Sequence, residues 1–177
     1  RNVICLAGRL DSPQKGFNIF LNAIENINIK NWEIYLLGML NDTQKKHIKK
    51  LCNTNKSLNG RIHLIGHVNN TERYWEYLLK SKIFCLPSIN DGLPLVIPDA
   101  MARGNAILSS DLYGLKNIIA KDNDIGFFFK NGDSADLSQK LQYLIDNPSV
   151  VKKKAKNGVL RANEILNWNK IVKNLDL

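Results

Sequence analysis

Two aspartates stand eight residues apart in a stretch that joins an apolar strand to a helix. Asp91 belongs to the turn signature Asn90-Asp91-Gly92, and Asp99 follows Pro98, a residue that fits only the first turn of a helix. The stretch therefore predicts two carboxylates beside the free backbone N–H groups of a helix start. Carboxylates accept hydrogen bonds from hydroxyl groups, and such N–H groups hold anions. A ligand that carries both hydroxyls and an anion would suit this site.

The same two residues also have a simpler interpretation. Asp91 can serve only the turn. Asp99 can serve only to oppose the positive end of the helix dipole, which is worth about 0.3–1 kcal/mol. The local pattern alone leaves both interpretations open.

Two cations near the N-terminus follow another apolar strand. Gly8-Arg9 comes directly after this strand, and a short loop leads on to Lys15-Gly16. A glycine at this point lets a ligand approach the backbone, and Arg9 and Lys15 can neutralise a phosphate. Two basic residues on a loop are also common as solvated side chains, so the phosphate site is one of two readings.

Apolar runs alternate with stretches of helical period along the whole chain. The runs lie near residues 2–7, 33–37, 61–65, 83–86, 105–109 and 125–129. The helices are expected from Phe17 to Ile27, over about 42–53 and 71–81, from near Leu95–Pro98, from Tyr113–Leu115, and over 134–146 and 149–165. This alternation predicts an α/β fold with a Rossmann-like parallel six-stranded sheet and helices on both faces. Ligands of such sheets bind beyond the carboxyl ends of the strands, where the loop with Arg9 and Lys15 lies.

Composition limits the class of protein. The chain has 177 residues, of which 44% are hydrophobic, so it is the size of one domain and can form a real core. It contains no run of 18 apolar residues and does not begin with Met, and we expect it to be part of a longer polypeptide. Cys5, Cys52 and Cys85 are expected to be reduced thiols of a cytosolic protein, and the three histidines show no metal-ligand spacing. No metal site is implied.

The net charge of +9 gathers in two lysine-rich stretches, 45–50 and 152–156. Each stretch has helical periodicity, so the interpretation we favour is a solvated helix face. The alternative is attraction to an anionic membrane surface or to nucleic acid. A third helix, 71–81, carries the apolar residues Tyr74, Trp75, Tyr77, Leu78 and Leu79, which we interpret as core.

The stretch around the two aspartates resembles the donor-binding signature of retaining glycosyltransferases of family 4, which have the GT-B fold. The matching residues are Pro87-Ser88, Asp91-Gly92-Leu93-Pro94 and Asp99-Ala100-Met101-Ala102-Arg103-Gly104, with Asp where the family usually has Glu. Gly8-Arg9-Leu10 and Lys15-Gly16 resemble a second element of the same family, in the expected order. The resemblance covers nearly the whole chain. It implies that residues 1–177 are the nucleotide-sugar (donor) binding domain, one half of a GT-B enzyme, and that the N-terminal acceptor domain is absent from this chain.

The resemblance also implies an activity. The enzyme would be a retaining hexosyltransferase that moves a sugar from a UDP- or GDP-sugar to a saccharide or lipid-linked acceptor, without a metal or other cofactor. Arg9, Lys15 and Asp91 would be catalytic, with the two cations and the amides around Gly92 to Leu95 stabilising the leaving diphosphate. Asp99 would hold the ribose hydroxyls. The other implied contacts to the nucleotide sugar are Gly8, Gly16, Gly38, Val68, Gly92, Leu93, Pro94 and Leu95.

The resemblance further implies a bacterial polysaccharide pathway, a cytoplasmic location or one peripheral to the inner face of the cell membrane, and no transfer by this domain without its N-terminal partner. Two rival functions stay open. One is a non-catalytic or degenerate nucleotide-sugar binding module. The other, which leaves the paired motifs unexplained, is a basic α/β module for anionic lipid or nucleic acid, so nucleic acid is not an expected partner. The sugar, the base and the acceptor are not determined by the sequence.

Overall fold

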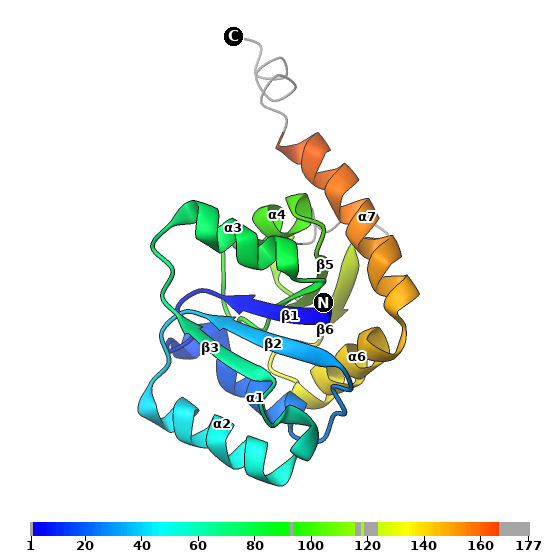
Figure 1. The fold of residues 1–177 in the computed structure, drawn as a ribbon. Helices are drawn as coiled ribbons and strands as arrows, with labels where there is room; N and C mark the ends of the chain where they lie inside the picture. Colours follow the sequence, from blue (N-terminus) through cyan, green and yellow to red (C-terminus); the bar gives the residue numbers. More distant parts are fainter. Residues whose placement is uncertain (1, 93, 116–117, 119–123, 167–177) are drawn as a thin grey trace.

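Six apolar strands lie side by side in one parallel sheet (Figure 1). The computed structural model describes residues 2–92, 94–115, 118 and 124–166. Within these residues the strands are β1 (Asn2–Ala7), β2 (Trp32–Leu37), β3 (Ile62–Gly66), β4 (Ile83–Leu86), β5 (Ala106–Ser110) and β6 (Gly126–Phe129). Their order in the sheet is β3-β2-β1-β4-β5-β6, and each neighbouring pair is parallel.

The six predicted strands are confirmed, each to within one residue at either end. The inner strands β1, β4 and β5 are almost completely buried. A parallel strand buried on both faces is mostly apolar, which makes it a nearly continuous apolar run in the sequence. The two buried serines that end β5 each donate a hydrogen bond to a backbone carbonyl. The predicted Rossmann-like α/β fold is therefore confirmed.

Helices cover both faces of the sheet (Figure 1). The structure has α1 (Phe17–Ile24), α2 (Asp42–Thr54), α3 (Thr71–Lys80), α4 (Val96–Ala102), α6 (Ser134–Asp146) and α7 (Pro148–Ile165), and the short 3-10 helices η1 (Pro13–Lys15), η2 (Lys56–Leu58) and η3 (Tyr113–Leu115). Side chains of α1, α2 and α6 pack with Ile4 and Leu6 of β1 in one apolar cluster. Side chains of α3, α4 and α7 pack with Val3 and Cys5 in the other. Successive residues of β1 thus point to opposite layers.

Helix α1 ends at Ile24, three residues before the predicted end at Ile27. The amide of Asn55 donates hydrogen bonds to the carbonyl oxygens of Ile24, Glu25 and Ile27 at 3.4, 3.0 and 2.8 Å. These bonds satisfy carbonyls at the helix end, so the helix need not continue. Ile27 is still buried, but in the segment that follows the helix.

The interpretation of all five apolar side chains of α3 as core is wrong. Leu78 is fully buried, but Trp75 is 37% exposed and Leu79 is 66% exposed. Tyr74 and Tyr77 are half-buried. Five residues within six consecutive positions occupy more than one face of a helix, because the period is 3.6 residues. Part of this helix is therefore free to border a site.

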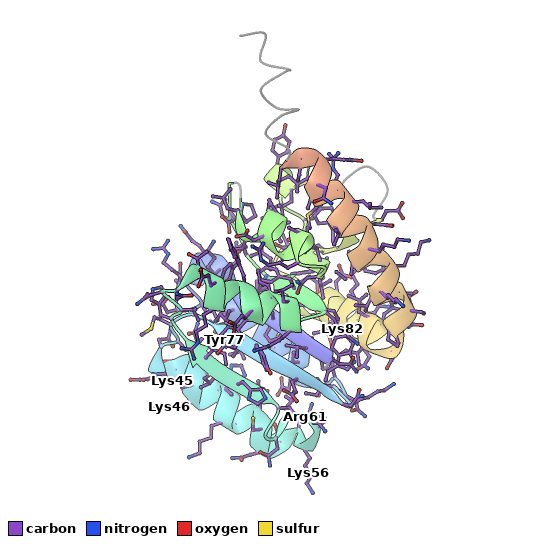
Figure 2. All side chains as sticks on the ribbon, turned by 45° about the horizontal axis from the view of Figure 1, so that its top comes forward. Lys45, Lys46, Lys56, Arg61, Tyr77 and Lys82 are labelled. Atoms are coloured by element: carbon purple, nitrogen blue, oxygen red, sulfur yellow. The ribbon has the colours of Figure 1, made fainter. Side chains whose placement is uncertain are left out.

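The basic clusters lie mostly on exposed helix surfaces. Figure 2 shows Lys45, Lys46, Lys56 and Arg61 along the surface formed by α2, η2 and the segment before β3. In the second cluster Lys154 is half-buried, and its Nζ lies 4.2 Å from the centre of the Phe127 ring. Attraction of either cluster to an anionic membrane stays a prediction. No helix in the described part of the chain is both long enough and apolar enough to cross a membrane.

Candidate functional site

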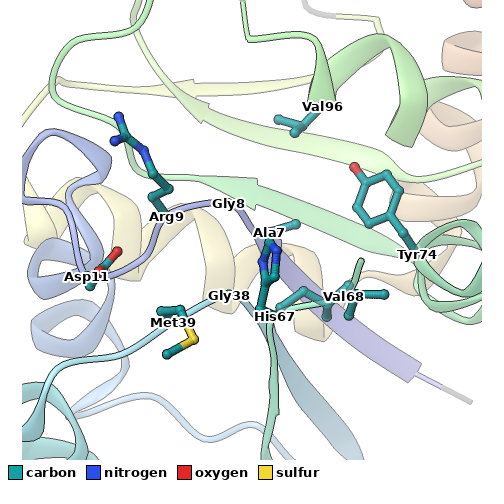
Figure 3. A pocket seen from close by; sticks show the side chains of 11 residues that line it. Ala7, Gly8, Arg9, Asp11, Gly38, Met39, His67, Val68, Tyr74 and Val96 are labelled. Atoms are coloured by element: carbon teal, nitrogen blue, oxygen red, sulfur yellow. The ribbon is translucent and has the colours of Figure 1, made fainter. Parts of the chain in front are cut away.

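A pocket of about 520 Å³ opens beyond the carboxyl ends of β1, β2 and β3 (Figure 3). It is lined by Ala7, Gly8, Arg9, Asp11, Leu37, Gly38, Met39, His67, Val68, Tyr74 and Val96. The sheet order reverses between β1 and β4, since the chain runs outward to β3 and then crosses back. This reversal is where open α/β sheets bind their ligands.

Two glycines shape the floor of the pocket. Gly38 has φ +146°, and a Cβ atom there would lie 1.9 Å from the carbonyl oxygen of Gly8. No side chain fits, so Gly38 is what lets the ends of β1 and β2 approach each other. Gly8 has φ +134°, and a Cβ atom there would meet nothing within 4 Å. Its backbone therefore faces open space, as expected for a residue that a ligand approaches.

The predicted catalytic residues Lys15 and Asp91 form an ion pair. Lys15 Nζ donates to Asp91 Oδ2 at 2.5 Å, and Ser88 Oγ donates to the same oxygen at 3.3 Å. The two charged side chains are only 24% and 16% exposed. The structure thus joins the loop after β1 to the loop after β4 at the point where the strand order reverses.

Several contacts fix the loop that carries Asp91. The Ile89 N–H donates to the Gln14 carbonyl at 2.8 Å, and the Asn131 amide donates to the Ile89 carbonyl at 2.7 Å. Ser110 Oγ donates to the carbonyl of Ser88 at 2.5 Å. The loop that carries Asp91 is therefore held by η1 after β1, by the last residue of β5 and by the loop after β6.

Gly16, predicted as a ligand contact, lies at the junction of η1 and α1 with φ +60°. A Cβ atom there would lie 1.9 Å from the Pro87 carbonyl oxygen, and Gly16 does not line the pocket. In this structure the glycine lets the loop with Lys15 pack against the loop with Asp91.

Asp99 lies in the first turn of α4, as predicted from Pro98. Arg103 Nη1 donates to Asp99 Oδ1 at 3.3 Å and to the Asp99 carbonyl at 3.1 Å. The guanidinium carbon of Arg103 lies 4.1 Å from the centre of the Trp75 ring. Val96 lines the pocket three residues before Asp99, and residues three apart share a helix face. Asp99 itself does not line the pocket. Its carboxylate stands at the rim, close enough to the lining residue Tyr74 to raise the pKa of that phenol. It is held by a cation that is itself stacked on an aromatic ring.

The remaining predicted residues divide into two groups. Arg9 and Val68 line the pocket, on opposite sides of it in Figure 3. Gly92, Pro94 and Leu95 do not line it. Pro94 is buried and Leu95 is 70% exposed, whereas the carbonyl of Gly92 packs against Gly114. The predicted contact Leu93 lies outside the described residues.

Sequence reasoning missed seven of the eleven lining residues, namely Ala7, Asp11, Leu37, Met39, His67, Tyr74 and Val96. Met39 and His67 directly follow glycines at strand ends, because Gly38 is the residue after β2 and Gly66 is the last residue of β3. Their positions were therefore a usable signal. Tyr74 had no signal, because its neighbours on α3 are apolar too. Among the described residues, no three His, Cys, Asp or Glu side chains gather as a metal site would require.

Several curated proteins are similar to this chain over almost its whole length. The MMP alpha-(1->4)-mannosyltransferase of Mycolicibacterium hassiacum is 25% identical over 174 residues, which are 97% of this chain and 41% of that protein. An alpha-1,4-N-acetyl-D-galactosaminyltransferase of Campylobacter jejuni, named for an undecaprenol-linked substrate, is 29% identical over 92% of this chain and 44% of that protein. The chain thus spans less than half the length of these relatives.

Solved structures share the fold. Sucrose-phosphate synthase from Thermosynechococcus elongatus superposes with a TM-score of 0.81 at 21% identity, over 99% of this chain and 44% of that one. Anabaena HepE, solved in complex with UDP and glucose, superposes with a TM-score of 0.76 at 19% identity, over 98% and 48%. The family model described as "Glycosyl transferases group 1" matches residues 1–161. The chain with this Rossmann-like sheet and this pocket therefore belongs to the group 1 glycosyltransferase family.

Proposed function

We propose that this chain is the donor-binding domain of a retaining glycosyltransferase and binds a nucleoside diphosphate sugar in the pocket beyond β1. The observation that carries the proposal is the ion pair of Lys15 with Asp91, which joins the loops after β1 and β4 where the strand order reverses. Arg9 lines the pocket and lies in the same loop after β1 as Lys15, although neither Lys15 nor Asp91 lines the pocket. An enzyme that cleaves the bond between a sugar and a diphosphate needs this combination of charges.

The chemistry follows from where charge develops. As the glycosidic bond breaks, negative charge grows on the leaving diphosphate and positive charge grows at the anomeric carbon. Arg9 and Lys15 stabilise the negative charge on the diphosphate. Asp91 orients the sugar and faces the positive charge at the anomeric carbon. Asp99, at the rim beside Val96, accepts hydrogen bonds from the ribose. A bond of this kind to a charged group contributes about 1.5–3 kcal/mol.

The donor nucleotide is proposed to be UDP or GDP. UDP is supported by the fold shared with HepE, which was solved with UDP and glucose bound. Arg9 and Lys15 neutralise the diphosphate in place of a metal ion, so the nucleotide binds without a metal. The acceptor half is proposed to be a separate N-terminal domain, because the relatives are more than twice as long as this chain. A saccharide or undecaprenol-linked acceptor is supported by the name of the Campylobacter relative.

The test is calorimetric titration of this chain with UDP, GDP and ADP, each in EDTA and in Mg²⁺. We expect one nucleotide to bind equally in both buffers. Arg9→Ala and Asp99→Ala should each weaken that binding by about tenfold or more, which corresponds to about 1.4 kcal/mol. Lys152→Ala is the matched control, since it removes an exposed cation of α7 that does not line the pocket.

The outcomes separate the alternatives. A folded chain that binds none of the three nucleotides overturns the donor-site proposal. Binding that requires Mg²⁺ overturns its metal-free part. Binding without transfer activity, once the chain is joined to its acceptor half, would instead favour the non-catalytic nucleotide-sugar module.

A further inference from the structure

Tyr74 places a hydroxyl group at the pocket that nothing in the proposed mechanism uses. The residue lies in the first turn of α3 and lines the pocket with Val68 and Val96. Its ring packs against the apolar cluster beneath α3 and α4. Figure 3 shows the hydroxyl turned toward Val96, across the pocket rather than toward solvent. A polar group therefore stands on a wall that is otherwise largely apolar.

The hydroxyl oxygen is buried, and within the described residues it has no hydrogen-bond partner. A buried hydroxyl without a partner costs free energy, because it has given up its bonds to water. A phenylalanine would fill the same space without this cost. Such a group needs an explanation, and a bound molecule that supplies the missing partner is one.

The position of Asp99 indicates which part of a ligand would reach the hydroxyl. Burial raises the pKa of Tyr74, and the nearby carboxylate of Asp99 raises it further. Val96 lines the pocket and shares a helix face with Asp99. The phenol lies across the pocket from Arg9 and Asp11 in Figure 3. The Asp99 carboxylate is close enough to this phenol to raise its pKa. Phosphates would lie near the arginine, which leaves the sugar of the nucleoside for this end.

We propose that the hydroxyl of Tyr74 forms a hydrogen bond with a ribose hydroxyl of the donor nucleotide, beside Asp99. This inference rests on the proposed function, and it makes Tyr74 a residue that selects ribonucleotides over deoxyribonucleotides. Asp99 accepts only, whereas a phenol both donates and accepts, so the two side chains together can satisfy a hydroxyl in both of its roles.

The experiment compares the effect of one substitution in the protein with the effect of removing single hydroxyl groups from the ligand. Wild-type chain and Tyr74→Phe are titrated with the nucleoside diphosphate that binds best, and with its 2′-deoxy and 3′-deoxy forms. We expect Tyr74→Phe to weaken binding of the ribonucleotide about tenfold and to leave binding of one deoxy form within about twofold of wild type. The deoxy form whose binding does not depend on Tyr74→Phe identifies the ribose hydroxyl that Tyr74 contacts. Tyr77→Phe is the matched control, because this tyrosine lies on the same helix and does not line the pocket.

A melting curve of the free protein adds a second readout. Tyr74→Phe should melt at the same temperature as wild type or higher, since it removes a group without a partner. Equal affinities of the wild type and Tyr74→Phe for the ribonucleotide would overturn the inference alone. Equal weakening for all three ligands would also overturn it, because it would mean that the phenol only shapes the pocket. A wild-type chain that binds no nucleotide overturns the proposed function, and this inference falls with it.

Discussion

The Nζ atom of Lys15 lies 2.5 Å from Oδ2 of Asp91, although the two residues are 76 positions apart in the chain. Lys15 is proposed to hold the diphosphate, and Asp91 is proposed to orient the sugar. In the structure, the two charges neutralise each other. A diphosphate that recruits the lysine must compete with this carboxylate. The pair therefore predicts opposite effects for the removal of its two members.

Lys15→Ala should weaken binding of the nucleoside diphosphate by about tenfold or more, because it removes a cation and leaves Asp91 uncompensated near the anion. Asp91→Asn should leave that binding unchanged or tighten it by up to about tenfold, since the lysine is released. Calorimetry on the two variants checks the signs. If Asp91→Asn weakens binding as much as Lys15→Ala does, the two residues act together on the ligand and the competition does not exist.

Gly16→Ala should destabilise the fold more than the same change at Gly60. Both glycines have a left-handed backbone, with φ +60° and φ +70°, so each alanine costs about 1–2 kcal/mol of backbone strain. Only at Gly16 would the new Cβ atom meet a backbone oxygen, that of Pro87 at 1.9 Å, whereas Gly60 has open space. The clash should add at least about 1 kcal/mol. Urea unfolding of both variants measures the difference, and equal losses would mean that the two loops do not pack as described.

Arg103→Gln should weaken nucleotide binding about threefold to tenfold through Asp99, whose carboxylate loses the cation that holds it at the rim. Its effect on the free energy of unfolding should stay within about 1 kcal/mol, because the Asp99 side chain is 41% exposed. Lys140→Gln is the matched control. It breaks another pair four residues apart, with Asp136 on α6, and should not change nucleotide affinity. Equal affinities in all three proteins would show that Asp99 does not depend on Arg103.

Thiol reactivity tests the packing of the sheet. Burial raises the pKa of the Cys5 thiol to about 12, and burial raises that of Cys85 as well. The thiolate is the reactive form, so neither residue should react with Ellman's reagent in the native protein at pH 8. At most one thiol, that of the half-buried Cys52, should react before unfolding, and all three should react in denaturant. Rapid reaction of two thiols under native conditions would contradict the buried position of β1 or β4.

Local sequence was sufficient for the elements and for part of the candidate site, including the lining residues Gly8, Arg9, Gly38 and Val68. Strand limits were predicted to within one residue because buried parallel strands are nearly continuous apolar runs. The start of α4 followed from Pro98, a residue that fits only the first turn of a helix. The chain alone also placed Arg9 and Lys15 at the end of one strand and Asp91 at the end of another.

Tertiary structure decided how these parts meet. Nothing in the periodicity of α3 shows that Tyr74 faces a pocket while Trp75 stacks on Arg103, the residue that follows α4. The pairing of Lys15 with Asp91 likewise depends on the order of the strands, which brings the ends of β1 and β4 together. Hydrophobic periodicity shows which face of a helix or strand is buried. It does not show which other element covers that face. Contacts between side chains of distant elements arise only when the sheet is assembled, because they depend on which strands become neighbours.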